Sequence, residues 1–237
     1  MEIIKSLNRR EAAITGAGLL YRYLLSKSDR STLLLLSGGS SLSIIEALGQ
    51  NSILPNLSIA LVDERWTTNP KDLNLTALKR VGFITKAQEK GIPIVAIEIE
   101  ETGNPTESAE RYENYLKQWR SVFPTGVIIA VLGVGTDAHI AGVLPYPEER
   151  AWFEDTFINS RKWVVGYDTK GKGDYPARVS VSLHFLTQEV DFAITYACGP
   201  EKQDALTRAL NVDGTMSDTP ARVLFLMKEA YLCTDAL

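Results

Sequence analysis

Short apolar runs, rich in leucine or β-branched residues, alternate along the chain with longer segments of helical pattern. Runs of this length that are apolar on both faces predict strands of a sheet covered on both sides, which is typical of parallel strands joined by crossover helices. The predicted strands span residues 32–36, 58–62, 92–97, 127–132, 162–167, 179–185, 192–197 and 223–227.

The segments between these strands carry the signals of helix ends. Asn8 followed by Glu11 resembles a capping pair before a helix that reaches about Ser26. A second helix is predicted after Thr106, where apolar residues recur at helical spacing. A third, 201–210, follows a Gly-Pro pair, because proline suits the first turn of a helix. The alternation of strands and helices predicts an α/β layered fold.

Composition narrows the class of protein. The chain has 237 residues, 45% of them apolar, which is enough for a core and excludes a disordered or fibrous chain. With 25 Lys+Arg against 29 Asp+Glu the net charge is −4, and this argues against nucleic acid as a partner while leaving room for a small anionic ligand. No linker separates two parts, so we predict one domain, 1–237, with 169–176 as a mobile surface loop.

The longest apolar stretch, 127–134, is far too short to cross a bilayer, and the N-terminal segment has no apolar signal core. We therefore expect a cytoplasmic protein without a membrane partner. The only cysteines are Cys198 and Cys233, and without a CxxC pair they predict reduced thiols rather than a disulfide or a metal site. Zinc- and calcium-binding spacings are also missing from the sequence, so we expect a mechanism without a metal.

The first candidate site follows the predicted strand 32–36. Ser37, Gly38, Gly39 and Ser40 form a turn in which two glycines allow backbone N–H groups to approach a ligand. The helix expected next adds the positive end of its dipole, so the turn suits an anion such as phosphate. An ordinary tight turn is the alternative, and the sequence lacks the Gly-Lys-Ser/Thr ending of a Walker loop.

The second candidate is the charged cluster at the end of the predicted strand 58–62. Arg65 can hold a phosphate or carboxylate with its planar fork. Asp63 or Glu64 can orient a sugar hydroxyl or transfer a proton. A salt-bridge cluster at the strand end is the alternative.

The third candidate, residues 133–139, follows the most apolar run in the chain and ends in one of only two histidines, His139. Histidine can act as a general base on water, and Asp137 could orient its ring. A structural histidine is the alternative. The segment also matches the G-x-G-x-x-A dinucleotide fingerprint, but no acidic strand end follows at the required distance, so we do not expect NAD(P) binding.

Two further cations and the second histidine occupy informative positions. Arg178 opens the predicted strand 179–185 and shares its polar face with His184, for which we expect a structural or solvated role. Lys202 lies in the first turn of the predicted helix 201–210, where acidic residues are usual, so it favours an anionic ligand. A solvated surface lysine is the alternative.

Taken in order, these segments resemble the 6-phosphogluconolactonase family, which is related to glucosamine-6-phosphate deaminase. The resemblance runs from about residue 30 to the C-terminus, and its most specific piece, 133–145, is similar to the family pattern G-x-G-x-D-G-H-[TI]-A-S-L-F-P. The segments that carry it are LSGGSS, VDERW followed by Asn74, GVGTDAHIAGVLP, ARVSVSL and CGPEKQDAL.

The resemblance implies a Rossmann-like three-layer α/β/α sandwich with a mostly parallel sheet. It implies hydrolysis of 6-phospho-D-glucono-1,5-lactone to 6-phosphogluconate in the pentose phosphate pathway, without metal or cofactor. At the matching positions His139 would be the general base with Asp137 beside it, and Asp63 is a third candidate catalytic residue. The residues expected around the substrate and its phosphate are Ser37, Gly38, Gly39, Ser40, Arg65, Arg178 and Lys202.

The sequence departs from the family pattern at several positions. Ala138 replaces the glycine before the histidine, and a positive φ there would cost about 1–2 kcal/mol. Two alternatives to a lactonase remain open: a deaminase/isomerase that uses Asp63 for proton transfer, and a non-catalytic sugar-phosphate-binding protein. Residues 142–145 lack the F-N-E-P stretch of the deaminases. We expect a monomer or homodimer.

Overall fold

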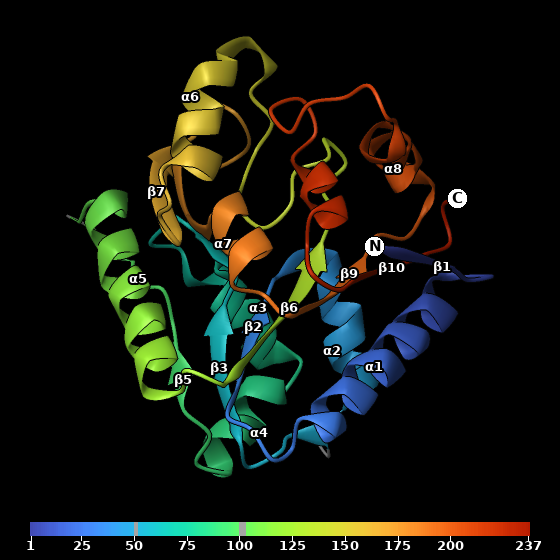
Figure 1. The fold of residues 1–237 in the computed structure, drawn as a ribbon, viewed down its shortest axis with the longest axis vertical. Helices are drawn as coiled ribbons and strands as arrows, with labels where there is room; N and C mark the ends of the chain where they lie inside the picture. The colour runs from blue at the N-terminus through green and yellow to red at the C-terminus, as the bar shows by residue number, and fades with distance from the viewer. Residues whose placement is uncertain (50–51, 100–102) are drawn as a thin grey trace.

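The computed structural model describes residues 1–49, 52–99 and 103–237. Its centre is a seven-stranded sheet with strand order β1-β10-β9-β6-β2-β3-β5, in which every neighbouring pair is parallel (Figure 1). This confirms the predicted α/β fold with a parallel sheet. The strands are β1 (Glu2–Lys5), β2 (Thr32–Leu36), β3 (Leu57–Leu61), β5 (Ile94–Val95), β6 (Val127–Gly133), β9 (Phe192–Tyr196) and β10 (Ala230–Thr234).

A second, three-stranded antiparallel sheet has the order β4-β8-β7. It comprises β4 (Asp63–Arg65), β7 (Val164–Asp168) and β8 (Ala177–Val181). The sequence predicts the second and third of these strands but places them among the parallel ones. The short connections explain the difference: β7 and β8 are joined directly by residues 169–176, and a connection of that length makes an antiparallel hairpin, whereas parallel strands need a longer crossover.

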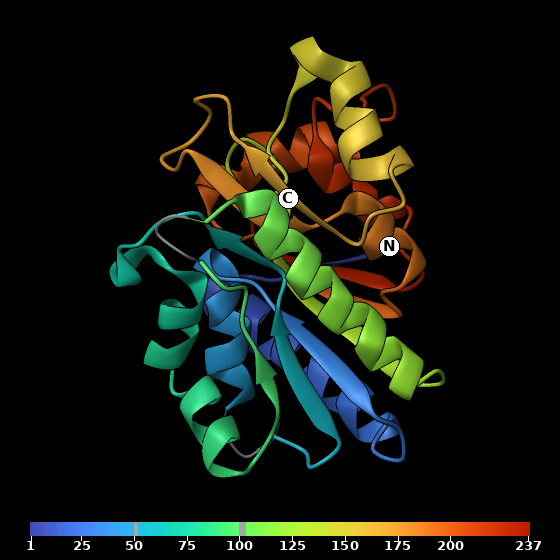
Figure 2. The ribbon, with the colours of Figure 1, turned by 90° about the vertical axis from the view of Figure 1, so that its left-hand side faces the viewer.

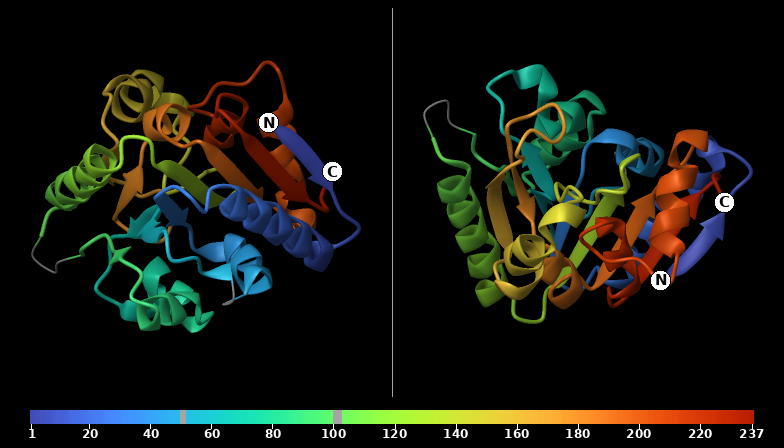
Figure 3. Two further views of the ribbon diagram at one scale, coloured as in Figure 1. Left: turned by 60° about the horizontal axis from the view of Figure 1, so that its bottom comes forward. Right: turned by 90° about the horizontal axis from the view of Figure 1, so that it is seen from above.

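The helices cover both faces of the parallel sheet. Figure 3 shows α1 and α2 on one side of it and α7 with the 3₁₀ helix η7 on the other. The long helix α5 packs against β7 and β8 of the small sheet (Figure 2). The α-helices are α1 (Arg9–Ser26), α2 (Leu42–Leu48), α3 (Asn74–Arg80), α4 (Phe83–Glu89), α5 (Pro105–Val122), α6 (Arg150–Glu154), α7 (Leu183–Gln188) and α8 (Gln203–Leu210). The shorter helices are η1 (Gly39–Ser41), η3 (Pro70–Asp72), η4 (Pro147–Glu149), η5 (Asp155–Asn159), η6 (Pro200–Lys202) and η7 (Pro220–Phe225).

Local sequence signals fix the ends of α1 and α5. The Asn8 side chain accepts a hydrogen bond from the Glu11 N–H at 2.9 Å, which confirms the predicted capping pair. The second predicted helix begins slightly earlier than its pattern indicates, because Asn104 caps it and Pro105 occupies its first turn. The central strands are deeply buried: every residue of β2 and every residue of β6 except Gly133 is buried.

Two strand predictions are wrong in position or extent, and one strand was not predicted. The apolar run 223–227 lies largely in η7, which starts at Pro220, while the strand of this region is β10, a few residues later. Proline suits the first turn of a helix and cannot donate to a sheet, so it favours the helical outcome. The predicted strand 92–97 is reduced to β5, and β1 at the sheet edge has no counterpart among the predictions.

The predicted strand 179–185 is also too long. It ends at Val181, and Ser182 then caps α7 by accepting the Phe185 N–H at 3.0 Å. His184 therefore lies on a helix and not on the polar face of a strand, and it does not line the pocket described below.

Residues 169–176, which the sequence predicts as a mobile surface loop, are tied to the body of the protein. The Tyr146 hydroxyl donates to the Thr169 carbonyl at 2.8 Å, and Lys172 Nζ donates to the Pro145 carbonyl at 2.9 Å. Thr169 itself is fully buried. Across the residues described by the structure, no helix combines the length and the apolar character needed to span a membrane.

Candidate active site

A pocket of about 330 Å³ opens where the ends of β2 and β6 meet the small sheet. Ligands of open α/β sheets bind beyond the carboxyl ends of the strands, and this pocket has that position. Apart from Asp137, all predicted site residues line it: Ser37, Gly38, Gly39, Ser40, Asp63, Arg65, His139, Arg178 and Lys202. The fold thus brings segments far apart in the sequence to one cavity.

The turn after β2 forms one side of the pocket. Ser41 Oγ donates to the Gly38 carbonyl at 2.9 Å and so fixes the turn that leads through η1 into α2. Gly38 is packed against Asn74, since a Cβ atom at this position would lie 2.0 Å from Asn74 Oδ1. Only glycine fits there, and its backbone is left accessible to a ligand.

Residues 133–139, the His139 loop, form the opposite side. His139 Nδ1 lies 2.6 Å from Asp137 Oδ1, and the His139 N–H donates to the same oxygen at 3.1 Å. Burial raises the pKa of Asp137, but the hydrogen bonds and charge of His139 outweigh burial and lower it to about 2. Asp137 is then a carboxylate at neutral pH and can only accept a hydrogen bond from the ring, so Nδ1 carries a proton and Nε2 is the ring nitrogen that does not contact Asp137.

The histidine is held by close backbone contacts within its own loop. A Cβ atom at Gly135 would lie 2.1 Å from His139 Nδ1, so the imidazole rests directly on this glycine. Ala138 adopts φ = 70°, a left-handed conformation that favours glycine, the residue of the family pattern at this position. Its side chain is fully buried. The loop therefore holds a non-glycine residue in the left-handed region, with strain beside the histidine.

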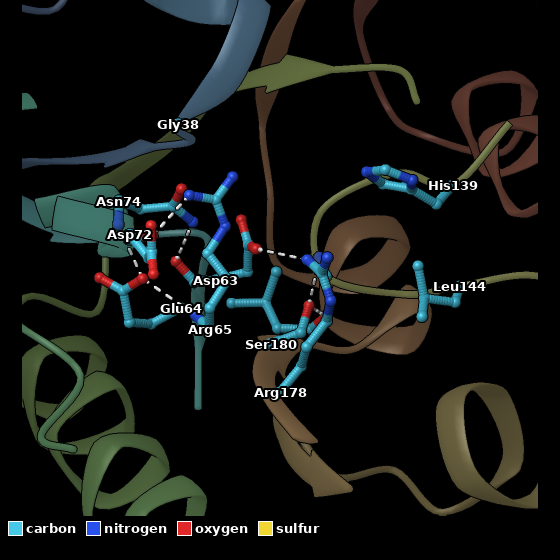
Figure 4. A network of polar contacts seen from close by, with 12 residues as sticks. Gly38, Asp63, Glu64, Arg65, Asp72, Asn74, His139, Leu144, Arg178 and Ser180 are labelled. Atoms are coloured by element: carbon cyan, nitrogen blue, oxygen red, sulfur yellow. Dashed lines mark hydrogen bonds and ion pairs between the residues drawn. The ribbon is translucent and has the colours of Figure 1, made fainter. Parts of the chain in front are cut away.

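The small sheet supplies two arginines to the pocket, because Arg65 of β4 pairs directly with Arg178 of β8. Arg178 Nη1 lies 3.6 Å from Asp63 Oδ2, and both side chains are almost fully buried. Arg65 donates to the Asp72 carbonyl at 2.7 Å. Its guanidinium lies 5.7 Å from the Tyr175 ring centre. In Figure 4, Arg178 lies between the Asp63 side of the pocket and His139.

Glu64 faces away from the pocket and has a structural role. Its carboxylate accepts N–H groups from Asn74 at 2.7 Å, Leu75 at 3.1 Å and Arg65 at 2.9 Å, so it caps α3. Burial raises the pKa of Glu64 to about 7, although these hydrogen bonds act in the opposite direction. Of the two acids considered at this position, Asp63 is the one that lines the pocket.

Lys202 ends the 3₁₀ helix η6, just before α8. Burial lowers the pKa of its amine, while the negative charges of Glu201 and Asp137 favour the charged form. The interaction with Asp137 places this cation on the His139 side of the pocket. Lys202, Arg65 and Arg178 thus approach the cavity from different elements, as a dianionic ligand would require.

Three polar pocket residues were not among the predicted site residues: Asn74, Asp174 and Tyr175. Asn74 appears in the motif behind the resemblance, but nothing in its local sequence indicates contact with the glycine turn. The two others belong to the hairpin 169–176, whose composition resembles that of an ordinary loop. Their position depends on the pairing of β7 with β8, which only the three-dimensional structure reveals.

Comparison with known proteins adds to this geometry. No match was found among curated proteins. Solved structures share the fold at low identity: a 6-phosphogluconolactonase from Shewanella baltica has a TM-score of 0.75 and 18% identity, covering 98% of this chain and 95% of the other. The enzyme from Trypanosoma brucei has a TM-score of 0.74 and 19% identity with the same coverage. That from Thermotoga maritima has a TM-score of 0.71 and 20% identity, covering 98% and 97%.

The match to a family model covers most of the chain, residues 19–232. This range includes the glycine turn, the two arginines of the small sheet, the His139 loop and Lys202. The model is that of the glucosamine-6-phosphate isomerases/6-phosphogluconolactonase, and the chain belongs to this family.

Proposed function

We propose that this protein hydrolyses 6-phospho-D-glucono-1,5-lactone to 6-phosphogluconate, with His139 as general base. The observation that carries the proposal is the contact of 2.6 Å between His139 Nδ1 and Asp137, which leaves Nε2 available in a pocket that also contains three cationic side chains. The family and the names of the similar structures are consistent with a lactone hydrolase.

In this mechanism, Nε2 of His139 takes a proton from water as the water oxygen attacks the lactone carbonyl carbon. The resulting tetrahedral intermediate carries its negative charge on the former carbonyl oxygen. When it collapses, the bond from C1 to the ring oxygen breaks, and His139 returns the proton to that oxygen as it becomes the C5 hydroxyl. Asp137 keeps the ring oriented and stabilises the imidazolium that forms between the two steps.

The cations have two tasks in the proposal. The phosphate dianion needs neutralising partners, and arginine is suited to bind it through two parallel hydrogen bonds. The developing oxyanion at C1 needs a donor as well, and Lys202 and Arg178 are the charged candidates that line the cavity. Binding energy from the phosphate also positions the reacting carbon next to the base. Independence from a metal or cofactor stays a prediction.

The test is a coupled assay on freshly made 6-phosphogluconolactone, corrected for its spontaneous hydrolysis. We expect His139→Ala to lower kcat by about 10²–10⁴-fold with a modest change in KM. His184→Ala is the matched control, because this second histidine lies on α7 outside the pocket, and it should retain wild-type rates. Equal kcat for His139→Ala and the wild type would contradict the assignment.

The same preparation separates the two alternatives. Release of ammonia from glucosamine 6-phosphate without lactone hydrolysis would identify a deaminase that uses Asp63, which also lines the pocket. Thermal stabilisation by 6-phosphogluconate without turnover of the lactone would identify a binding protein. Lactone hydrolysis above the spontaneous rate supports the proposed function.

A further inference from the structure

Asn74 is the first residue of α3 and lies between two segments of the pocket. It is only 1% exposed, yet it contributes to the pocket lining. Its backbone N–H donates to Glu64 at 2.7 Å, which fixes the start of the helix. Its side-chain Nδ2 donates to the Asp63 carbonyl at 2.9 Å, which fixes the start of β4. Figure 4 shows the side chain between Gly38 and Asp63.

The other end of the same carboxamide meets the glycine turn. A Cβ atom on Gly38 would lie 2.0 Å from Asn74 Oδ1, 2.7 Å from its Cγ and 3.2 Å from its Cβ. The Asn74 carboxamide therefore acts as a spacer between the turn after β2 and the strand that carries Asp63 and Arg65. A smaller side chain at residue 74 would leave a gap, and a side chain at residue 38 would force the two segments apart.

Asn74 Oδ1 is buried without a hydrogen-bond partner in the described part of the chain, and so is the hydroxyl of Ser37 in the adjacent turn. Unpaired buried polar atoms are unfavourable, and where a structure keeps them they require an explanation. An apolar side chain of similar size would fill the space next to Gly38 without leaving an unpaired oxygen. It could not donate to the Asp63 carbonyl, however, and this donor is the only part of the carboxamide that makes a hydrogen bond within the described residues.

We propose that Asn74 is a positioning residue: it sets the distance between the anion-binding turn at Gly38 and the Asp63–Arg178 pair, so that both contact the same phosphosugar. This inference rests on the proposed function for the identity of the ligand. Asn74 acts through Gly38 and Asp63, and its effect reaches Arg178 because Asp63 lies 3.6 Å from that guanidinium.

A double-mutant cycle tests the spacing. Gly38→Ala places a methyl group against the Asn74 carboxamide, and we expect KM for the lactone and Kd for 6-phosphogluconate to rise at least tenfold, since a displacement of about 1 Å can cost 10²-fold. Asn74→Ala removes Oδ1 and Cγ, so the new methyl group at residue 38 would meet only the Cβ atom of residue 74, at 3.2 Å. The double variant should therefore bind 6-phosphogluconate more tightly than Gly38→Ala alone, although each single change weakens binding.

The matched control is Gly18→Ala, because a Cβ there meets only Arg22 at 3.7 Å, far from the pocket. Its Kd should equal that of the wild type. Melting temperatures of all variants show whether each remains folded at the assay temperature. Asn74→Asp keeps the size of the side chain but removes the donor to Asp63, and it should lower kcat/KM about tenfold or more.

The outcome of the cycle is independent of turnover, because it is measured as binding of 6-phosphogluconate. If the two substitutions are simply additive, or if the double variant binds more weakly than Gly38→Ala, the spacing role is wrong even for an active lactonase. If the variants show the predicted coupling in binding 6-phosphogluconate but the wild type does not hydrolyse the lactone, the proposed function fails and the spacing role stands. Wild-type constants for Asn74→Asp would contradict the role of the hydrogen bond to Asp63.

Discussion

Two sides of the pocket are built in different ways. The His139 loop takes its shape from contacts among neighbouring residues: Gly135, Asp137 and His139 touch one another within five positions of the chain. Another part of the lining, which we call the arginine wall, consists of Asp63, Arg65, Asn74 and Arg178 and joins segments more than 100 residues apart. Local sequence therefore specifies the proposed base, whereas strand register specifies the groups proposed to bind the substrate.

The difference has an energetic side. At the His139 loop, the proposed functional geometry coincides with backbone strain, because Ala138 in the loop and Ala141 just after it both have positive φ. In the arginine wall, the proposed functional geometry coincides with buried charge. Asp63 and Arg178 face each other almost without solvent, and the neighbouring Glu64 is also buried. Changes to the loop should mainly affect the chemical step, and changes to the wall should affect binding and stability.

The largest effect is expected from Gly135→Ala in the His139 loop. The added methyl group would occupy space 2.1 Å from His139 Nδ1 and 2.4 Å from Asp137 Oδ1, so the ring must move. We expect kcat to fall by about 10²–10³-fold while KM changes little, because the base is displaced and the wall is untouched. Steady-state kinetics on fresh lactone measure both constants. A large rise in KM at unchanged kcat would break the proposed division between loop and wall.

The Glu64→Gln substitution tests how a buried acid next to the arginine wall affects stability as the pH changes. The pKa of Glu64 in the folded protein is about 7, above its ordinary value of 4.5, because the group is buried. Its contribution to stability is therefore fully present below pH 4.5 and is lost as the pH rises through 7. As the pH rises across this window, the wild type should lose up to about 3 kcal/mol in free energy of unfolding relative to the Glu64→Gln variant.

Urea unfolding at a series of pH values measures this difference for Glu64→Gln. The exposed pair Lys86–Glu89 offers a control, since Glu89→Gln should show little dependence on pH over the same interval. A constant difference between wild type and Glu64→Gln from pH 4.5 to 7 would mean that burial does not govern this carboxyl.

The smallest effect is expected from Ala138→Gly, which restores the residue of the family pattern. Relief of the positive φ favours the variant by about 1–2 kcal/mol. Loss of a buried methyl and greater freedom of the unfolded chain act against it by a comparable amount. We expect the melting temperature to change by only a few degrees and kcat to stay within about threefold of the wild type. A tenfold gain in kcat would show that Ala138 tilts His139 and limits the native enzyme.

The sequence predicted those parts of the fold whose signals are local. The runs that form β2 and β6 are apolar on both faces, and Asn8 with Glu11 marks the start of α1. The run 223–227 is equally apolar, but its first three residues lie in the helix η7, and Phe225 and Leu226 are exposed. A short apolar run therefore neither distinguishes a strand from a short helix nor guarantees burial.

The same limit applies to the candidate site. His139, Asp137 and the glycine turn follow predicted strands directly, so their convergence at one edge of a parallel sheet could be expected. Asn74 could not be placed, because its contact with Gly38 depends on where Glu64 fixes the start of α3. Tyr175 approaches Arg65 only because β8 runs antiparallel to β4, a pairing that no periodicity in the sequence encodes.

The hairpin that joins β7 to β8 offers a practical route to altered selectivity. The ladder from Val164 to Asp168 holds Arg178 in place independently of what the connecting residues 169–176 contain. Asp174 and Tyr175 at the pocket edge can therefore be exchanged without changing the strand pairing that places Arg178, while an exchange of Tyr175 also removes the ring beside the Arg65 guanidinium. A library confined to these two positions would vary the pocket edge around the proposed catalytic residues, and phosphorylated lactones are the ligands with which to screen it.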